Sequence, residues 1–183
     1  SLVSVVRDGR RVPAVVVGTK MGHLFVLHRE TGTPLFPVEE RPAPASDIPG
    51  ERTSPTQPVP LTPPALVSQR LDADTLHAPT PEHLAACRDQ LATLRNDGLF
   101  TPPSLRGSIH HPGAGGGANW SGATWDPARQ LLVVPVQNLA MIVQLEAIAE
   151  RATGGGANVK PLHGFSLRTA WWLFTGRGTG ERY

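Results

Sequence analysis

Short apolar runs separated by turn residues dominate the start of the chain. Such runs cover residues 2–6, 12–17 and 23–27. They are rich in Val, Leu and Phe and too short for stable helices, so the pattern predicts three strands. Asp8-Gly9 stands between the first two runs, and Lys20-Met21-Gly22 stands between the last two. Because Asp-Gly between apolar runs is a strong hairpin signal, we expect an antiparallel meander.

A proline-rich segment interrupts this pattern after the meander. Thr31-Gly32 closes the third strand, and Phe36 follows as a bulky core residue. Prolines are frequent over residues 37–64, and each removes a backbone donor and restricts the residue before it. We expect residues 37–64 to contain neither strand nor helix, and residues 37–79 to form a polyproline-like strap over the surface. Disorder is the alternative interpretation.

Residues 80–98 form the one segment with a helical pattern. Thr80 can cap its N-terminus, Pro81 suits the first turn, and Glu82 favours the positive end of the helix. Gly98 is placed to end it. The predicted apolar face consists of Leu84, Cys87, Leu91 and Leu94, with Cys87 as a small buried apolar residue.

Strand patterns return after a glycine-rich segment. Four glycines occur in residues 113–117, which allows a close approach of the backbone to a ligand or to other backbone. The segment fits neither a P-loop nor a dinucleotide fingerprint. Runs at 121–125 and 131–136 flank a turn at 126–129, and 138–145 supplies another strand. We expect a second antiparallel meander here.

Composition supports a turn-rich, mostly β protein. Gly and Pro number 19 each, and charged residues make up 17% of the chain. The net charge of +2, without a basic stripe interleaved with aromatic residues, argues against nucleic-acid binding. The sequence has no apolar run long enough to span a membrane and no secretory signal at its start. The single cysteine excludes an intramolecular disulfide.

The two ends of the sequence suggest a piece of a longer protein. The chain begins with Ser1, in the middle of a strand-like pattern. Residues 146–183 form a divergent tail with flexible glycines at 154–156 and an apolar cluster at 171–174, which is either a divergent strand or a frameshifted end.

Three residues stand out as candidate binding groups. Lys20 is one of only two lysines, against fifteen arginines, and its compact charge at a turn suits a single carbonyl oxygen. Asn119 and Trp120 follow the glycines and together suit a flat polar heterocycle. A solvated turn lysine and a Trp used only for packing are the alternatives. His110 and His111 are adjacent, point to opposite faces of an extended segment, and are interpreted as structural rather than metal-binding.

The segments GTKMGHLFVLHRETGTPLF and GLFTPPSLRGSIHHPGAGGGANWSGATWDPARQLLVVPVQNLA resemble the glucose dehydrogenase branch of the pyrroloquinoline quinone (PQQ) dehydrogenases. The resemblance covers roughly residues 12–145. In that family a turn lysine and the Asn-Trp of a G-G-x-N-W segment contact PQQ. The resemblance therefore implies that Lys20, Asn119 and Trp120 bind the cofactor. No metal ligand and no catalytic residue is identified in the chain, since neither Asp47 nor Asp126 matches the family's catalytic segment.

The resemblance also implies a fold and a reaction. The expected fold is all-β: two to three blades of an eight-bladed β-propeller over residues 1–145, with the strap and the helix inserted. The expected reaction is oxidation of a sugar, glucose-like, or an alcohol by hydride transfer to the quinone. The catalytic aspartate and the ligands of Ca²⁺ are expected upstream of Ser1.

The resemblance also leads to expectations about the electron acceptor and the cellular location of the parent protein. A quinone or a cytochrome would accept the electrons, and the parent protein would be periplasmic or attached to the membrane on its periplasmic side. The isolated piece is expected to be inactive. The alternative is a non-enzymatic propeller-type scaffold or binding module with a degraded pocket. Such a scaffold would need neither Lys20 nor the Asn119-Trp120 pair.

Overall fold

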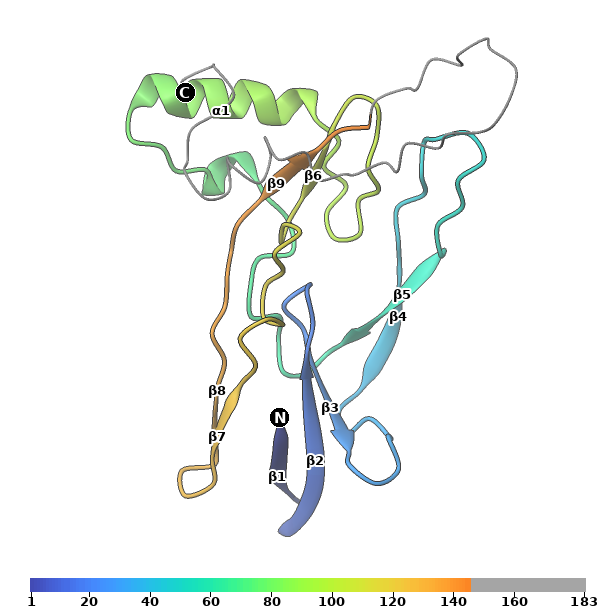
Figure 1. Ribbon diagram of the computed structural model, residues 1–183, viewed down its shortest axis with the longest axis vertical. Coiled ribbons are helices and arrows are strands. Elements are labelled where there is room, and N and C mark those ends of the chain that lie inside the picture. Colours follow the sequence, from blue (N-terminus) through green and yellow to red (C-terminus); the bar gives the residue numbers. More distant parts are fainter. Residues whose placement is uncertain (146–183) are drawn as a thin grey trace, which may run out of the picture.

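The computed structural model describes residues 1–145. The predicted tail, with its glycines at 154–156 and its apolar cluster at 171–174, lies outside the described residues. Within residues 1–145 the chain forms four small antiparallel sheets and one α-helix (Figure 1). No helix in this part is long and apolar enough to cross a bilayer.

The predicted first meander is confirmed. Strands β1 (Leu2–Arg7), β2 (Arg10–Gly18) and β3 (Leu24–His28) pair antiparallel in the order β1-β2-β3. Asp8 and Gly9 have φ angles of 49° and 73°, the positive values that a tight two-residue hairpin turn requires. The first hairpin therefore forms where the Asp-Gly pair indicated it.

Both faces of this sheet are apolar. On one face Val3, Val16 and Val26 are buried in the core. On the opposite face Leu2 is 63% exposed and Val6 is 59% exposed. A sheet that is apolar on both faces is typical of one covered on both sides, and within the described residues the second face keeps Leu2, Val6 and Val17 exposed.

The chain begins a fourth strand beside β3. The N–H of Leu35 donates to the carbonyl of Val26 (2.8 Å), and Pro34 forms a β-bridge with Leu27. Phe36 packs against the core, as expected from the Thr-Gly turn before it. The strand ends here, since the chain then turns away into the proline-rich segment.

The prediction of no strand in the strap was wrong. Strands β4 (Val38–Pro42) and β5 (Thr56–Pro60) form a separate two-stranded ribbon. At its two ends, the Leu61 N–H donates to the Pro37 carbonyl and the Ala43 N–H donates to the Pro55 carbonyl. Because hydrogen-bonded and non-hydrogen-bonded pairs alternate along an antiparallel ladder, residues 37, 39, 41 and 43 belong to the hydrogen-bonded pairs. The prolines at 42, 58 and 60 fall on the alternate positions, where the missing N–H would point away from the partner strand. This spacing makes the prolines compatible with pairing.

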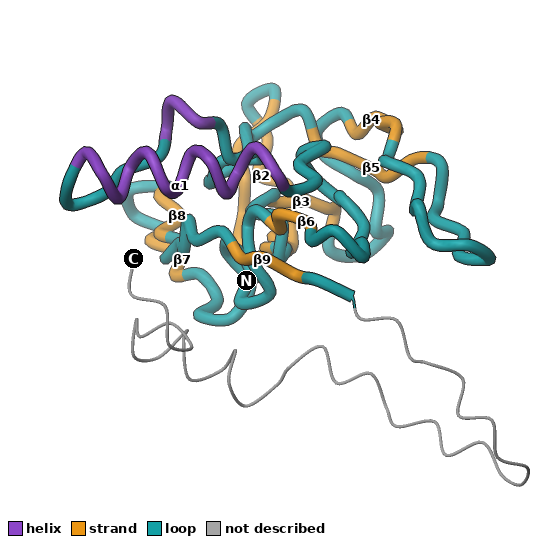
Figure 2. The backbone as a smooth tube through the Cα atoms, turned by 90° about the horizontal axis from the view of Figure 1, so that it is seen from above, coloured by secondary structure: helices purple, strands orange, loops and turns teal. Residues whose placement is uncertain are grey.

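The predicted helix is present but shorter than expected. Helix α1 runs Pro81–Thr93, and the Thr80 hydroxyl accepts a hydrogen bond from the His83 N–H (3.3 Å) as the predicted cap. The helix ends well before Gly98, because Arg95 bridges to Ser108 and pulls the chain out of helical geometry. α1 lies along the outside of the molecule (Figure 2), with no buried side chain. Its predicted apolar face, Cys87 included, is only half-buried.

The expected second meander is wrong in its pairing. Strands β7 (Thr124–Asp126) and β8 (Leu131–Val133) form the predicted hairpin. Strand β9 (Met141–Val143) instead pairs antiparallel with β6 (Ser108–His110), near α1. A short 3₁₀ turn, η1 (Ala73–Thr75), precedes α1.

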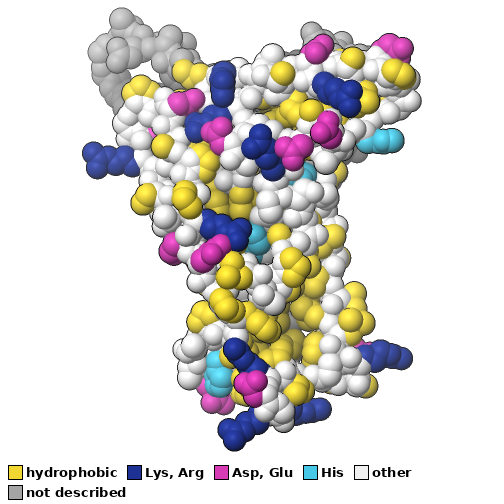
Figure 3. Space-filling view, turned by 180° about the vertical axis from the view of Figure 1, so that it is seen from behind, with side chains coloured by type: hydrophobic (Ala, Val, Ile, Leu, Met, Phe, Trp, Pro, Cys, Tyr) yellow, Lys and Arg dark blue, Asp and Glu magenta, His cyan; other side chains and the backbone are white. Residues whose placement is uncertain are grey.

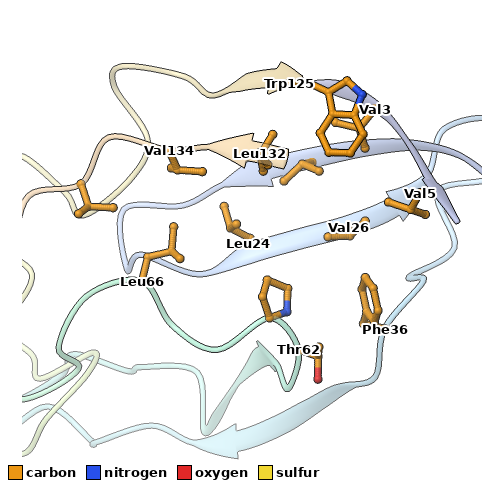
Figure 4. Close-up of a pocket in the computed structure, with 13 residues that line it drawn as sticks. Val3, Val5, Leu24, Val26, Phe36, Thr62, Leu66, Trp125, Leu132 and Val134 are labelled. Carbon is orange, nitrogen blue, oxygen red and sulfur yellow. The ribbon is translucent and has the colours of Figure 1, made fainter. Parts of the chain in front are cut away.

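The core lies between the first sheet and the β7–β8 hairpin. An apolar groove of about 550 Å³ runs between them, with Trp125 and Leu132 on one side and Leu24 and Val26 on the other (Figure 4). Hydrophobic side chains gather along the hollowed lower part of the molecule (Figure 3). The groove continues the apolar face of β1–β3 across to the hairpin.

Candidate functional site

The turn between β2 and β3 holds Lys20 at the surface. The N–H of Gly22 donates to the carbonyl of Thr19 (3.0 Å), and Gly22 has a φ of +76°. The His23 N–H donates to the Thr19 hydroxyl (3.1 Å) and fixes the end of the turn. This leaves the Lys20 side chain exposed at the rim.

The glycine-rich segment lies directly against this turn. The Gly117 N–H donates to the carbonyl of Lys20 (2.6 Å). A Cβ on Gly18 would stand 2.6 Å from the carbonyl oxygen of Ala118, and one on Gly117 would stand 3.1 Å from the Cα of Gly22. Side chains at these positions would separate the two backbones, so glycine is what allows the contact.

The Lys20 ammonium points toward the same segment. Its Nζ donates to the carbonyl of Ala114 (3.0 Å) and lies 5.5 Å from the centre of the Trp120 ring. This distance is within the range of a cation–π interaction. An ammonium carries three donors, and within the described residues it makes one hydrogen bond. Lys20 therefore presents positive charge and donors to a ligand beside Trp120.

Asn119 contributes an oxygen to the same place. Its Oδ1 is buried and has no hydrogen-bond partner among the described residues. It lies over Gly116, where an added Cβ would collide with that oxygen and stand 3.0 Å from the Lys20 Cγ. An unpaired buried acceptor costs about 1–3 kcal/mol, which a donor supplied by a ligand would recover. Asn119 also lines a hollow of about 300 Å³ next to Gly18.

The structure thus brings the three predicted residues together from distant parts of the sequence. Lys20 comes from the β2–β3 turn, and Asn119 and Trp120 follow the glycines. Trp120 is 75% exposed, so most of its ring is free to cover a ligand. Sequence reasoning missed the Ala114 carbonyl and the Gly116 surface, because a backbone oxygen and a missing side chain leave no signal of their own.

The other titratable side chains considered for a site are histidines whose charged form is disfavoured by burial. Burial lowers the pKa of His110 and of His111 and so favours the neutral form of both side chains. Burial also lowers the pKa of His23, and the nearby Arg41 charge acts in the same direction. Within residues 1–145 no group of three or more His, Cys, Asp or Glu side chains is placed to hold a metal ion.

The two aspartates considered at the sequence level are engaged with arginines elsewhere. Asp126 accepts hydrogen bonds within the β7–β8 turn, and its pairing with Arg129 lowers its pKa. Asp47 lies 3.6 Å from Arg95, and this ion pair joins the strap to the chain that follows α1.

The site formed by Lys20, Asn119 and Trp120 offers an ammonium, a buried amide oxygen and an exposed indole ring. This combination suits the binding and charge stabilisation of a flat, electron-poor ring that bears oxygens.

Comparison with known proteins gives a family for this chain. The family described as glucose/ethanol/alcohol dehydrogenase, β-propeller domain, in the PQQ group matches residues 1–165. The quinate/shikimate dehydrogenase (quinone) of Acinetobacter baylyi is 39% identical over 154 residues, which cover 81% of this chain and 19% of the relative. The quinoprotein glucose dehydrogenase of Gluconobacter oxydans is 39% identical over 146 residues, covering 79% of this chain and 18% of the relative.

A third relative has another substrate in its name. The glycerol dehydrogenase large subunit of Gluconobacter thailandicus is 41% identical over 128 residues, covering 69% of this chain and 17% of the relative. The chain therefore spans about a fifth of the length of these curated relatives. No solved structure matches. The predicted family resemblance and the predicted fold class, part of a β-propeller, are confirmed.

Proposed function

The chain belongs to the PQQ-dependent glucose, ethanol and alcohol dehydrogenases, and on that premise we propose that it forms part of an enzyme that oxidises a sugar or an alcohol. The observation that supports this best is the convergence of Lys20, Asn119 and Trp120 on one site. Relatives named for quinate, glycerol and glucose are 39–41% identical, so the substrate class is proposed only as a polyhydroxy compound.

The residues of the site fit PQQ, a flat polycyclic quinone with several carboxylates. Lys20 would hold the quinone oxygens through its two unused donors. Trp120 would cover the ring system with its exposed face. Asn119 would accept a hydrogen bond from the cofactor's ring N–H at its unpaired Oδ1.

Within the proposed reaction, these residues act by placement and charge. Bound PQQ would supply the two-electron acceptor that receives hydride from the substrate carbon. Lys20 would place a fixed positive charge where negative charge develops on the acceptor oxygens. Trp120 would exclude water from that charge pair, which strengthens the attraction between the two charges.

The rest of the proposed machinery belongs to other parts of the enzyme. A carboxylate would take the substrate hydroxyl proton, and a divalent cation, Ca²⁺ in our expectation, would polarise the acceptor. A quinone or cytochrome would then remove the electrons. We place the complete enzyme in the periplasm or on the periplasmic side of the membrane, as an inference from the family.

Substitution of Lys20 tests the proposal. In the complete enzyme, Lys20→Ala should reduce turnover about a hundredfold to a thousandfold, because loss of a comparable donor costs about 2.7–4 kcal/mol of transition-state stabilisation. Its melting temperature should stay close to that of the wild type, since the side chain is exposed. Dye-linked turnover at saturating PQQ is the measurement. Turnover within threefold of the wild type would show that Lys20 does not face the acceptor.

The alternative is a propeller-type binding module with a degraded pocket. It predicts that PQQ changes neither the absorbance nor the thermal stability of the complete protein. Under our proposal, PQQ should raise the melting temperature of the wild type, because a ligand that binds only the folded state stabilises it. An unchanged melting temperature at high PQQ concentration would favour the binding module.

A further inference from the structure

A short segment after the strap, residues 66–69, lies against the back of the Lys20 turn. The Leu66 N–H donates to the carbonyl of Gly22 (2.9 Å). The Gln69 side-chain Nε2 donates to the carbonyl of Met21 (2.8 Å) and to that of Val67 (3.0 Å). This segment therefore bonds to the carbonyls of Met21 and Gly22, the two residues that directly follow Lys20.

Val67 packs beside the contact between the turn and the glycine-rich segment. Its side chain is 7% exposed. A Cβ on Gly22 would collide with it, and a Cβ on Gly117 would stand 2.8 Å from it. Val67 thus packs against both backbones that carry the candidate site, beside the point where they meet.

The same segment is tied to the far side of the glycine-rich segment. The Ser68 N–H donates to the Asn138 side-chain oxygen (3.1 Å). The neighbouring Gln137 N–H donates to the carbonyl of Gly117 (2.8 Å). Residues 66–69 therefore contact three regions that are distant in sequence: the Lys20 turn, the glycines facing it, and Asn138, whose neighbour Gln137 is bonded to Gly117.

We propose that Gln69 is a positioning residue for Lys20. This inference rests on the proposed function, since it concerns the approach of Lys20 to the cofactor. The Lys20 side chain is exposed and makes one hydrogen bond within the described residues, so its location depends on the backbone that bears it. Gln69 fixes that backbone through the hydrogen bond from its Nε2 to the Met21 carbonyl, while its Oε1 is buried and has no hydrogen-bond partner among the described residues.

A double-mutant cycle in the complete enzyme tests this inference. Gln69→Ala should weaken PQQ binding about tenfold, measured by equilibrium dialysis. In a Lys20→Ala background the same change should weaken binding less than twofold, because residues that act through one another are not additive. Gln69→Met, which keeps the length of the side chain but has no donor, should behave as Gln69→Ala and covers the case in which the alanine variant does not fold.

Gln144→Ala is the matched control. Gln144 also donates from its Nε2 to a backbone carbonyl, that of Leu105, at 2.9 Å, but it lies on the β6–β9 side of the molecule. Its substitution should leave PQQ affinity within twofold of the wild type. An equal loss for Gln69→Ala and Gln144→Ala would overturn a specific role for Gln69.

The remaining outcomes separate this inference from the proposed function. Equal effects of Gln69→Ala with and without Lys20 would overturn the positioning role, and so would no effect at all or a failure of both Gln69 variants to fold. If Lys20→Ala alone leaves PQQ affinity unchanged, the proposed function fails at this site and the inference fails with it. A loss with Lys20→Ala but none with Gln69→Ala overturns only the inference.

Discussion

Gly116 is the residue where the candidate site has least room for an additional atom. It has a φ of +80°, and an added Cβ would meet both Asn119 and Lys20. We expect Gly116→Ala to displace both side chains and to weaken PQQ binding at least tenfold in the complete enzyme. The positive φ alone should destabilise the fold by about 1–2 kcal/mol.

Gly32→Ala separates these two effects. Gly32 has a φ of +73°, and an added Cβ there would meet nothing within 4 Å. It should therefore show a similar loss of thermal stability with unchanged PQQ affinity. Equal affinities for the Gly116 and Gly32 variants would show that the space over Gly116 is not part of the cofactor site.

Trp120 and Trp125 lie five positions apart and give opposite predictions. Trp120→Ala should weaken PQQ retention, measured by dialysis, and should change stability by less than about 0.5 kcal/mol, because the ring is mostly exposed. Trp125→Ala should lower the melting temperature, because that ring packs against the core. If Trp120→Ala instead destabilised the fold without loss of PQQ, the ring would serve packing alone.

The sequence singled out three residues that lie together in the candidate site, but it did not indicate the residues that hold them in place. Lys20, Asn119 and Trp120 stood out because of residue type and neighbouring glycines, and the family resemblance gave them a common ligand. Gln69 and Val67 gave no such signal. Their role depends on which backbones they touch, and tertiary contacts between residues 66–69, the turn and the glycines are absent from local sequence patterns.

At the level of elements, the strap is held in place by one buried arginine. Arg95 donates to Asp97 (2.6 Å) and to the carbonyl of Ala45 (2.6 Å), and it is 9% exposed. Arg95→Met should keep much of the packing and lose these bonds. We expect it to free the strap near Ala45, so that limited proteolysis cuts this region faster than in the wild type.

Arg129→Met is the control for this prediction. Arg129 also pairs with an aspartate, Asp126, but its side chain is 78% exposed, and this pairing lies within its own turn. Its loss should leave cleavage of the strap unchanged. An unchanged cleavage rate in Arg95→Met would mean that the β4–β5 pairing alone holds the strap.

Prediction from sequence succeeded for elements set by local signals and failed for those set by distant partners. The Asp-Gly hairpin and the Thr80 cap were correct because turn and cap chemistry is local. The end of α1 was wrong because Arg95 pairs with the distant Ser108. The β4–β5 ribbon was missed because the frequency of proline does not show whether each missing N–H points toward the partner strand or away from it.

At the level of the whole molecule, the second face of the first sheet is expected to control association. Leu2, Val6 and Val17 are exposed there, at 63%, 59% and 44%. Exposed apolar faces of this kind mark contacts with other protein layers. We predict that the isolated chain self-associates, as measured by light scattering, and does not oxidise glucose or simple alcohols with PQQ, Ca²⁺ and an artificial acceptor.

Two substitutions test whether this face is responsible. Leu2→Lys with Val17→Lys should reduce self-association, since charges on the face oppose its burial. The pair Leu131→Lys and Val133→Lys, on exposed positions of β8, is the control. Sustained turnover by a monodisperse monomer would identify the isolated chain as a complete enzyme of another kind.

The placement of prolines in the β4–β5 ribbon bears on how such association proceeds. Along the outer edge of β5, positions 58 and 60 have no N–H, so Thr56 is the one residue of that edge within the strand that can donate to a third strand. At the outer edge of β5 a neighbouring chain therefore finds almost no donors with which to continue the ladder, and prolines at edges are one way in which natural sheets resist further pairing. Association of the isolated chain should accordingly proceed by contact between sheet faces rather than by addition of strands at the β5 edge, so a thioflavin T signal should not arise from this edge.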